Sequence, residues 1–174
     1  MRVQGVALAN KDGRGGMSDP YLKLLTLPAS DLGIYQTAHE LKDEEFSKMK
    51  EMYTVELKKT EVINNNANPE WKEFEVDMDK LIACFPDDGI TQGLAPGQFN
   101  RAHCSYIYFD TKFMIECWDK DTVTKDDEIG WIVTTVRQLC TMQPLVLRDR
   151  VGGGSDKPGS LEITGIQIEP KPAV

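Results

Sequence analysis

The sequence has few of the residues from which several common kinds of site are built. It contains 2 histidines and 4 cysteines among 174 residues, and no two cysteines stand in a CxxC pair. A cysteine zinc site or a disulfide framework needs closely spaced or dense cysteines, so neither is expected. The motifs GxSxG, HExxH and the P-loop are also missing. We therefore do not expect an enzyme.

Positive charge is in short supply. The chain has 20 lysine and arginine residues against 28 aspartate and glutamate residues, a formal net charge of −8. Nucleic acid requires a basic surface, so it is excluded as a partner. An anionic membrane would also repel this chain, unless a bound cation reversed the charge locally.

Long apolar runs are missing as well. No stretch approaches the roughly 20 apolar residues that a membrane-spanning helix needs. The opening MRVQGVALANKDG lacks the apolar stretch of a signal peptide. Together with the few cysteines, this favours a reducing compartment, and we expect a cytoplasmic protein.

Short apolar stretches separated by turn residues predict strands. Eight such runs occur, and they are residues 3–9, 21–27, 54–63, 71–78, 112–118, 129–136, 144–149 and 159–168. Many short strands with turns between them are typical of an antiparallel sandwich. The sequence thus predicts an all-β, eight-stranded antiparallel β-sandwich, with one domain over 1–170 and a tail at 171–174.

Two long segments interrupt this pattern. Residues 36–53 could form a helical insertion with one apolar stripe, made by Leu41, Phe46, Met49 and Tyr53. Residues 80–111 read as a long irregular crossing, and loops of such length usually carry function or structure of their own.

The stretch WDKDTVTKDDEIG, residues 118–130, concentrates carboxylates between two predicted strands. It is not an EF-hand loop, because positions 5, 6 and 12 counted from Asp119 lack the required ligands and glycine. Asp119, Asp121 and Asp127 could instead converge at the mouth of a hairpin. Calcium prefers six to eight oxygen ligands, so a second loop must contribute. NKDGRGGMSDPY offers Asp12 and Asp19.

Three motifs in order resemble one family. GMSDPYLKL, KKTEVINNNANPEWKEF and IECWDKDTVTKDDEIGW look like a C2 domain, and the second is most similar to the copines. The resemblance implies a module that binds Ca²⁺ and then an anionic phospholipid membrane of the phosphatidylserine kind. It would target a larger protein to the membrane when calcium rises, with protein partners also possible.

The resemblance also implies which residues act. The calcium ligands would be Asp12, Asp19, Asp119, Asp121 and Asp127. Asp12 departs from the family spacing by one extra residue before Asp19. The membrane contacts would be Arg14, Met17, Val123 and Lys125.

Three alternatives stay open on the sequence. The acidic stretch could be a solvated turn, since acidic clusters are common in loops. The domain could be a calcium-independent C2 scaffold that binds proteins. A hydrolase could hold a catalytic metal in the same loops, although no activating base is evident. Trp118 points opposite to Asp119 along the strand, and we expect it to pack in the core.

Overall fold

The computed structural model describes residues 1–12, 16–27, 54–77, 80, 109–148 and 157–168. Within these ranges the chain forms seven strands and one short helix. They are β1 Arg2–Val6, β2 Pro20–Thr26, β3 Glu56–Lys59, β4 Lys112–Asp119, β5 Asp127–Thr135, α5 Val136–Cys140, β6 Leu145–Val146 and β7 Ser160–Gly165. The predicted helical insertion at 36–53, the tail and most of 80–111 lie outside the described residues.

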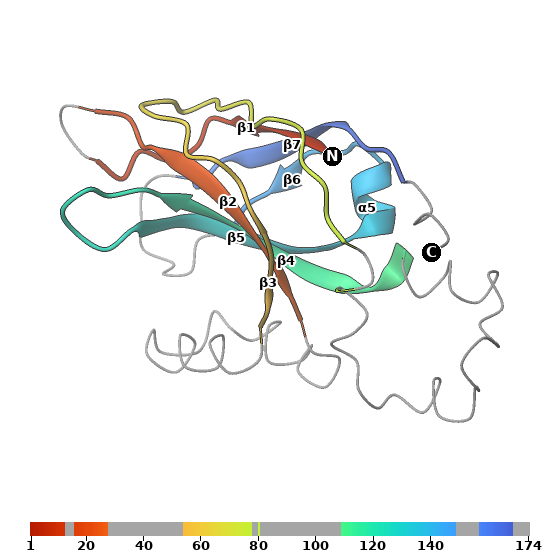
Figure 1. The fold of residues 1–174 in the computed structure, drawn as a ribbon. Coiled ribbons are helices and arrows are strands. Elements are labelled where there is room, and N and C mark those ends of the chain that lie inside the picture. Colours follow the sequence, from red (N-terminus) through yellow and green to blue (C-terminus); the bar gives the residue numbers. More distant parts are fainter. Residues whose placement is uncertain (13–15, 28–53, 78–79, 81–108, 149–156, 169–174) are drawn as a thin grey trace, which may run out of the picture.

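The strands form two antiparallel sheets (Figure 1). One has the order β1-β7-β6 and the other has the order β3-β2-β4-β5. A single apolar cluster joins them, with Val3 and Leu161 from the first sheet and Leu22 and Ile115 from the second. The predicted all-β antiparallel sandwich is confirmed.

β4 shows how alternation builds this core. Phe113, Ile115 and Cys117 point into the space between the sheets, as expected for every second residue of a strand. Met114 points the other way and joins a separate buried cluster that includes Trp131. Both faces of the four-stranded sheet therefore carry buried apolar side chains.

Trp118 does not lie in the core between the sheets, so that prediction is wrong. It is partly buried on the outer face, where the Lys23 ammonium lies 4.6 Å from the ring centroid. Its indole N–H donates to the Glu116 carboxylate at 2.8 Å. The inner face at this end is taken by the neighbouring residues, Cys117 and Asp119.

The predicted strand at 71–78 is also wrong for the residues described, 71–77, which explains a count of seven rather than eight. Glu70 makes one isolated bridge to Gln4. The chain then follows β1 through a few bonds outside any assigned strand, such as the pair in which Phe74 N–H donates to the Met1 carbonyl at 3.1 Å and the Met1 ammonium donates to the Phe74 carbonyl at 2.8 Å. The buried side chains Trp71 and Phe74 are three residues apart. That spacing breaks the two-residue alternation of a half-buried strand.

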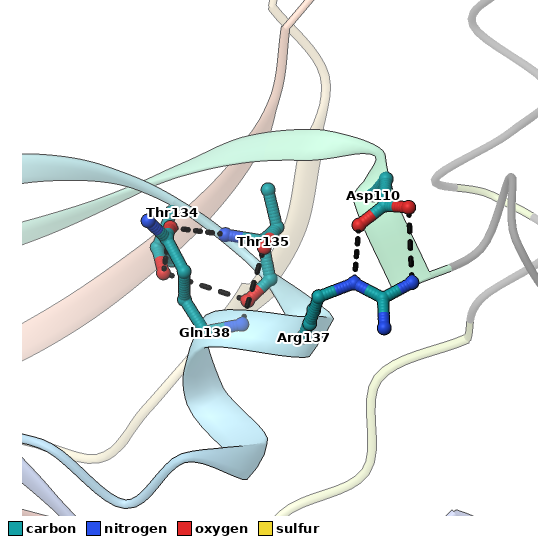
Figure 2. Close-up of polar contacts among 5 residues, drawn as sticks. All are labelled: Asp110, Thr134, Thr135, Arg137 and Gln138. Atoms are coloured by element: carbon teal, nitrogen blue, oxygen red, sulfur yellow. Dashed lines mark hydrogen bonds and ion pairs between the residues drawn. The ribbon is translucent and has the colours of Figure 1, made fainter.

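The sequence analysis did not anticipate helix α5. Thr135 caps it: the Thr135 hydroxyl accepts from Gln138 N–H, while the Gln138 side chain accepts from Thr135 N–H. Figure 2 shows this capping box and a two-bond ion pair from Arg137 to Asp110, at 2.6 and 3.0 Å. The T-x-x-Q spacing was the available signal.

The registers bring three connections to one end of the sandwich, at the left of Figure 1. We call it the loop end. It comprises the first loop, residues 7–19, the second loop, residues 60–69, and the third loop, residues 120–126, with residues 13–15 outside the described part. Helix α5 lies toward the opposite end.

Candidate functional site

Strand pairing fixes the backbone at the loop end. Asp119 is the last residue of β4, and it pairs with Asp127, the first residue of β5. On its other side Asp119 pairs with Pro20, the first residue of β2, which follows Asp19. The predicted ligands Asp19, Asp119 and Asp127 therefore lie together at one end of the four-stranded sheet, although Asp19 and Asp127 are 108 positions apart in the sequence (127 − 19).

Hydrogen bonds tie the first loop to the third. Asp19 N–H donates to Asp119 Oδ1 at 2.6 Å, and Lys120 N–H donates to the Asp19 carbonyl at 3.1 Å. Asp119 is only 1% exposed. A buried carboxylate needs such partners, because unpaired burial of a charge is costly. This contact holds Asp119 in a fixed orientation.

The second loop joins the same network through Asn65. Its backbone N–H donates to Asp19 Oδ1 at 2.6 Å, and its side-chain oxygen accepts from Met17 N–H at 2.7 Å. Asn65 has a φ of 54°, a left-handed conformation that asparagine tolerates better than most residues. Sequence reasoning saw turn chemistry here but did not assign Asn65 a role at the site.

The pKa of Asp12 shows the influence of the other four predicted ligands. Its pKa is raised, first by desolvation and then by the negative charges of Asp119, Asp19, Asp121 and Asp127. Like charges act in this way when they lie near one another. The structure therefore gathers all five predicted carboxylates at the loop end, Asp12 included, despite its extra residue of spacing.

The side chains of these carboxylates are not arranged to hold a metal ion in this structure. In the described part of the chain, no three or more His, Cys, Asp or Glu side chains adopt such an arrangement. Asp19 and Asp119 each use an oxygen in a bond to a backbone N–H. The donor set is nevertheless all oxygen, which is the ligand type that Ca²⁺ prefers.

Asp126 forms a further contact set in the third loop, which sequence reasoning missed. Its carboxylate accepts from Lys120 Nζ and from the Tyr21 hydroxyl, both at 2.7 Å, and from Asp121 N–H at 3.3 Å. The bond from Lys120, more than that from Tyr21, lowers the pKa of Asp126 to about 2. Burial, more than the bond to Asp126, raises the pKa of Tyr21 above its usual value.

Those predicted membrane contacts that the structure describes lie at the loop end. Val123 is 93% exposed at the tip of the third loop, and Lys125 is exposed beside it. Met17 in the first loop is 45% exposed. Arg14 lies outside the described residues.

Comparison with known proteins identifies the family. The model of the C2 domain family matches residues 2–84 and 92–149, and the chain belongs to this family. C2 domains are known for binding membranes, lipids and proteins, and they are generally non-catalytic. No curated protein matches the sequence.

The fold is shared with one solved C2 domain, BON1-C2B, and two further solved structures show a weaker likeness. BON1-C2B is 18% identical with a TM-score of 0.53, and the alignment covers 92% of this chain and 83% of that one. The first C2 domain of a plant Extended Synaptotagmin 1 is 20% identical with a TM-score of 0.46, covering 92% and 87%. A C2 domain of RIM from Drosophila is 14% identical with a TM-score of 0.38, covering 78% and 86%.

The copine subtype is not established by these comparisons and stays a prediction.

None of the helices in the described ranges is long and apolar enough to cross a membrane.

Proposed function

We propose that this C2 domain binds anionic phospholipid membranes when calcium occupies the loop end. The observation that supports this most is the gathering of Asp12, Asp19, Asp119, Asp121 and Asp127, seen in the strand registers and in the raised pKa of Asp12. Such a cluster is costly without a cation, because like charges at short range repel.

The proposed mechanism is electrostatic. Five ionised carboxylates repel an anionic headgroup, and a chain of net charge −8 adds to that repulsion. Two bound Ca²⁺ ions would supply about four positive charges and leave coordination positions for lipid oxygens. The exposed Lys125 would then add attraction on the order of 1 kcal/mol at an anionic surface. Val123 and Met17 would contact the headgroup region.

Sedimentation with phosphatidylserine vesicles, in calcium or in chelator, tests the proposal. The key variant is Asp119→Asn with Asp121→Asn, because asparagine keeps an oxygen for the bond from Asp19 N–H while removing charge. The matched control is Glu73→Gln with Glu75→Gln. These two exposed residues flank Phe74, whose backbone bonds to Met1 at the other end of the sandwich.

We expect wild type and the control pair to sediment with vesicles in calcium and to remain free in chelator. The Asp119→Asn/Asp121→Asn protein should lose calcium-dependent binding by at least about tenfold, since it removes two charged ligands. Equal binding by this variant and wild type would refute the proposed site.

One observation favours a second candidate, a calcium-independent C2 scaffold for protein partners. Asp19 and Asp119 already make bonds that join the three loops, so these carboxylates have a structural role without a metal. If wild type is folded and binds neither calcium nor vesicles under either condition, the scaffold function is supported instead.

A further inference from the structure

The third loop is held by a carboxylate that is not among the five expected ligands. Asp126 Oδ1 accepts from Lys120 Nζ at 2.7 Å and from Asp121 N–H at 3.3 Å, and Oδ2 accepts from the Tyr21 hydroxyl at 2.7 Å. Both oxygens are thus engaged within the protein. The bond to Asp121 N–H closes the turn that runs from 121 to 126.

Tyr21 anchors this carboxylate to the sheet. It lies in β2, pairs with Trp118 of β4, and is 0% exposed. The Lys59 ammonium lies 4.3 Å from its ring centroid. The Tyr21 hydroxyl therefore comes from a fixed ring, so Asp126 is bonded to the rigid part of the domain rather than to a neighbouring loop.

The position of Asp126 relates it directly to the proposed ligands. It precedes Asp127 in the chain, and its side chain holds the backbone of Asp121. Lys120 also forms an ion pair with Asp126, which offsets its charge. Asp126 can thus order the loop while adding little to the repulsion among the five carboxylates.

We propose that Asp126 is a positioning residue that fastens the third loop to β2 through Tyr21 and sets Asp121 and Asp127 in place before calcium binds. This inference rests on the proposed function for its effect on calcium. The ordering of the loop itself does not depend on calcium and can be measured without it. Ordering a loop in advance strengthens binding, because less conformational entropy is lost when the ligand arrives.

Three variants separate the parts of this contact. Asp126→Ala removes all of its bonds. Tyr21→Phe removes the anchoring hydroxyl and keeps the buried ring. Asp126→Asn keeps a side-chain oxygen for Asp121 N–H and serves as the conservative rescue. The matched control is Asp110→Ala, which breaks a similar exposed ion pair with Arg137 away from the loop end (Figure 2).

The first measurement is calcium affinity by titration calorimetry, alongside the melting temperature in chelator. Loss of one hydrogen bond corresponds to about a fivefold change in an equilibrium constant, and loss of two to about thirtyfold. We expect weakening of that size in Asp126→Ala and Tyr21→Phe, with Asp126→Asn close to wild type. Asp110→Ala should leave calcium affinity unchanged even if it lowers the melting temperature.

The second measurement is amide hydrogen exchange of Asp121 in chelator, which reports loop order alone. Exchange should be faster in Asp126→Ala and Tyr21→Phe than in wild type and Asp110→Ala. Unchanged exchange at Asp121 in Tyr21→Phe would overturn the inference. If wild type binds calcium, an unchanged calcium affinity in Asp126→Ala would overturn it as well. Faster exchange in a protein that binds no calcium would refute the proposed function and leave the loop anchor standing.

Discussion

At the scale of single residues, the direction in which a side chain points decides its chemistry at the loop end. Along β4, the alternate residues Phe113, Ile115 and Cys117 face the space between the sheets, and Asp119 continues this series. Asp119 is buried and accepts a hydrogen bond from Asp19 N–H. Trp118, one residue earlier, falls on the outer face beside Lys23. Because successive side chains of a strand point to opposite faces, the carboxylate of Asp119 lies at the site and the indole of Trp118 does not.

Asp12→Asn should have opposite effects on the domain with and without calcium. The pKa of Asp12 is higher in the folded protein than in the unfolded chain. Its protonated carboxyl therefore stabilises the fold below the unfolded pKa, and this contribution is lost as the pH rises through the folded pKa. At neutral pH the ionised Asp12 therefore destabilises the calcium-free fold. Asparagine should raise the melting temperature in chelator and reduce the further rise that calcium produces.

Thermal unfolding at several pH values checks this prediction. The gain from Asp12→Asn in chelator should disappear below about pH 4, where the wild-type carboxyl is itself protonated. Glu75→Gln is the control, an exposed carboxylate outside the loop end for which neither effect is expected. A lower melting temperature for Asp12→Asn in chelator at neutral pH would contradict the assigned sign.

At the scale of elements, β5 lies close to the chain just after β6 and just before β7. A side chain at Gly130 would place its Cβ 2.9 Å from Pro158 Cβ, 3.0 Å from the Arg148 carbonyl oxygen and 3.1 Å from Leu147 Cβ. The bonds between Trp131 and Arg148, at 2.8 and 3.0 Å, hold this edge together. The edge therefore requires glycine for space rather than for a special φ.

Gly130→Ala should destabilise the domain by about 1–3 kcal/mol, the usual cost of adding a methyl group to a packed site. Gly165→Ala is the control, because its nearest neighbours at 2.7 Å belong to the end of the flexible Arg2 side chain. Urea unfolding of both variants measures the difference. Equal free energies of unfolding would show that the β5 edge relaxes as easily as the Arg2 side chain.

The capping box of α5 gives a second element-scale prediction. Thr135→Ala removes the hydroxyl that accepts from Gln138 N–H and should cost about 1 kcal/mol. Thr135→Ser keeps the hydroxyl and should cost less. Urea unfolding of both proteins tests this, and an equal loss in the two would assign the effect to the missing methyl group rather than to the cap.

At the scale of the whole molecule, membrane attraction has to overcome a net charge of −8. The proposed switch acts locally, at an end where calcium would offset five carboxylates, while the rest of the surface stays acidic. Such attraction is screened over a Debye length of about 8–10 Å at physiological salt.

Binding to phosphatidylserine vesicles in calcium should therefore weaken as salt rises from about 0.1 to 1 M, where the Debye length falls to about 3 Å. Vesicles of phosphatidylcholine alone should bind less at every salt concentration, because they carry no net charge. Sedimentation over a salt series checks both points. Binding that is insensitive to salt and to lipid charge would indicate apolar insertion, with Val123 as the first residue to replace.

Much of this domain could be predicted from the pattern of its residues. Alternation and turn chemistry gave the antiparallel sandwich, since both reflect local backbone preferences and burial on one face. The order of SDPY, NPEW and WDKD led to the C2 family, which the family match confirms. The strand at 71–78 failed because Trp71 and Phe74 are buried at a spacing of three, set by packing rather than by local preference.

The candidate site divides in the same way. The amino-acid sequence alone shows which carboxylates are available, because acidic residues around turns can be recognised without a structure. The folded structure adds that the charges of the other four aspartates act on Asp12, that Asn65 bonds to Asp19, and that Tyr21 bonds to Asp126. The Tyr21–Asp126 bond spans 105 residues. Contacts of that kind follow from strand order and register, which depend on the packing of the whole chain.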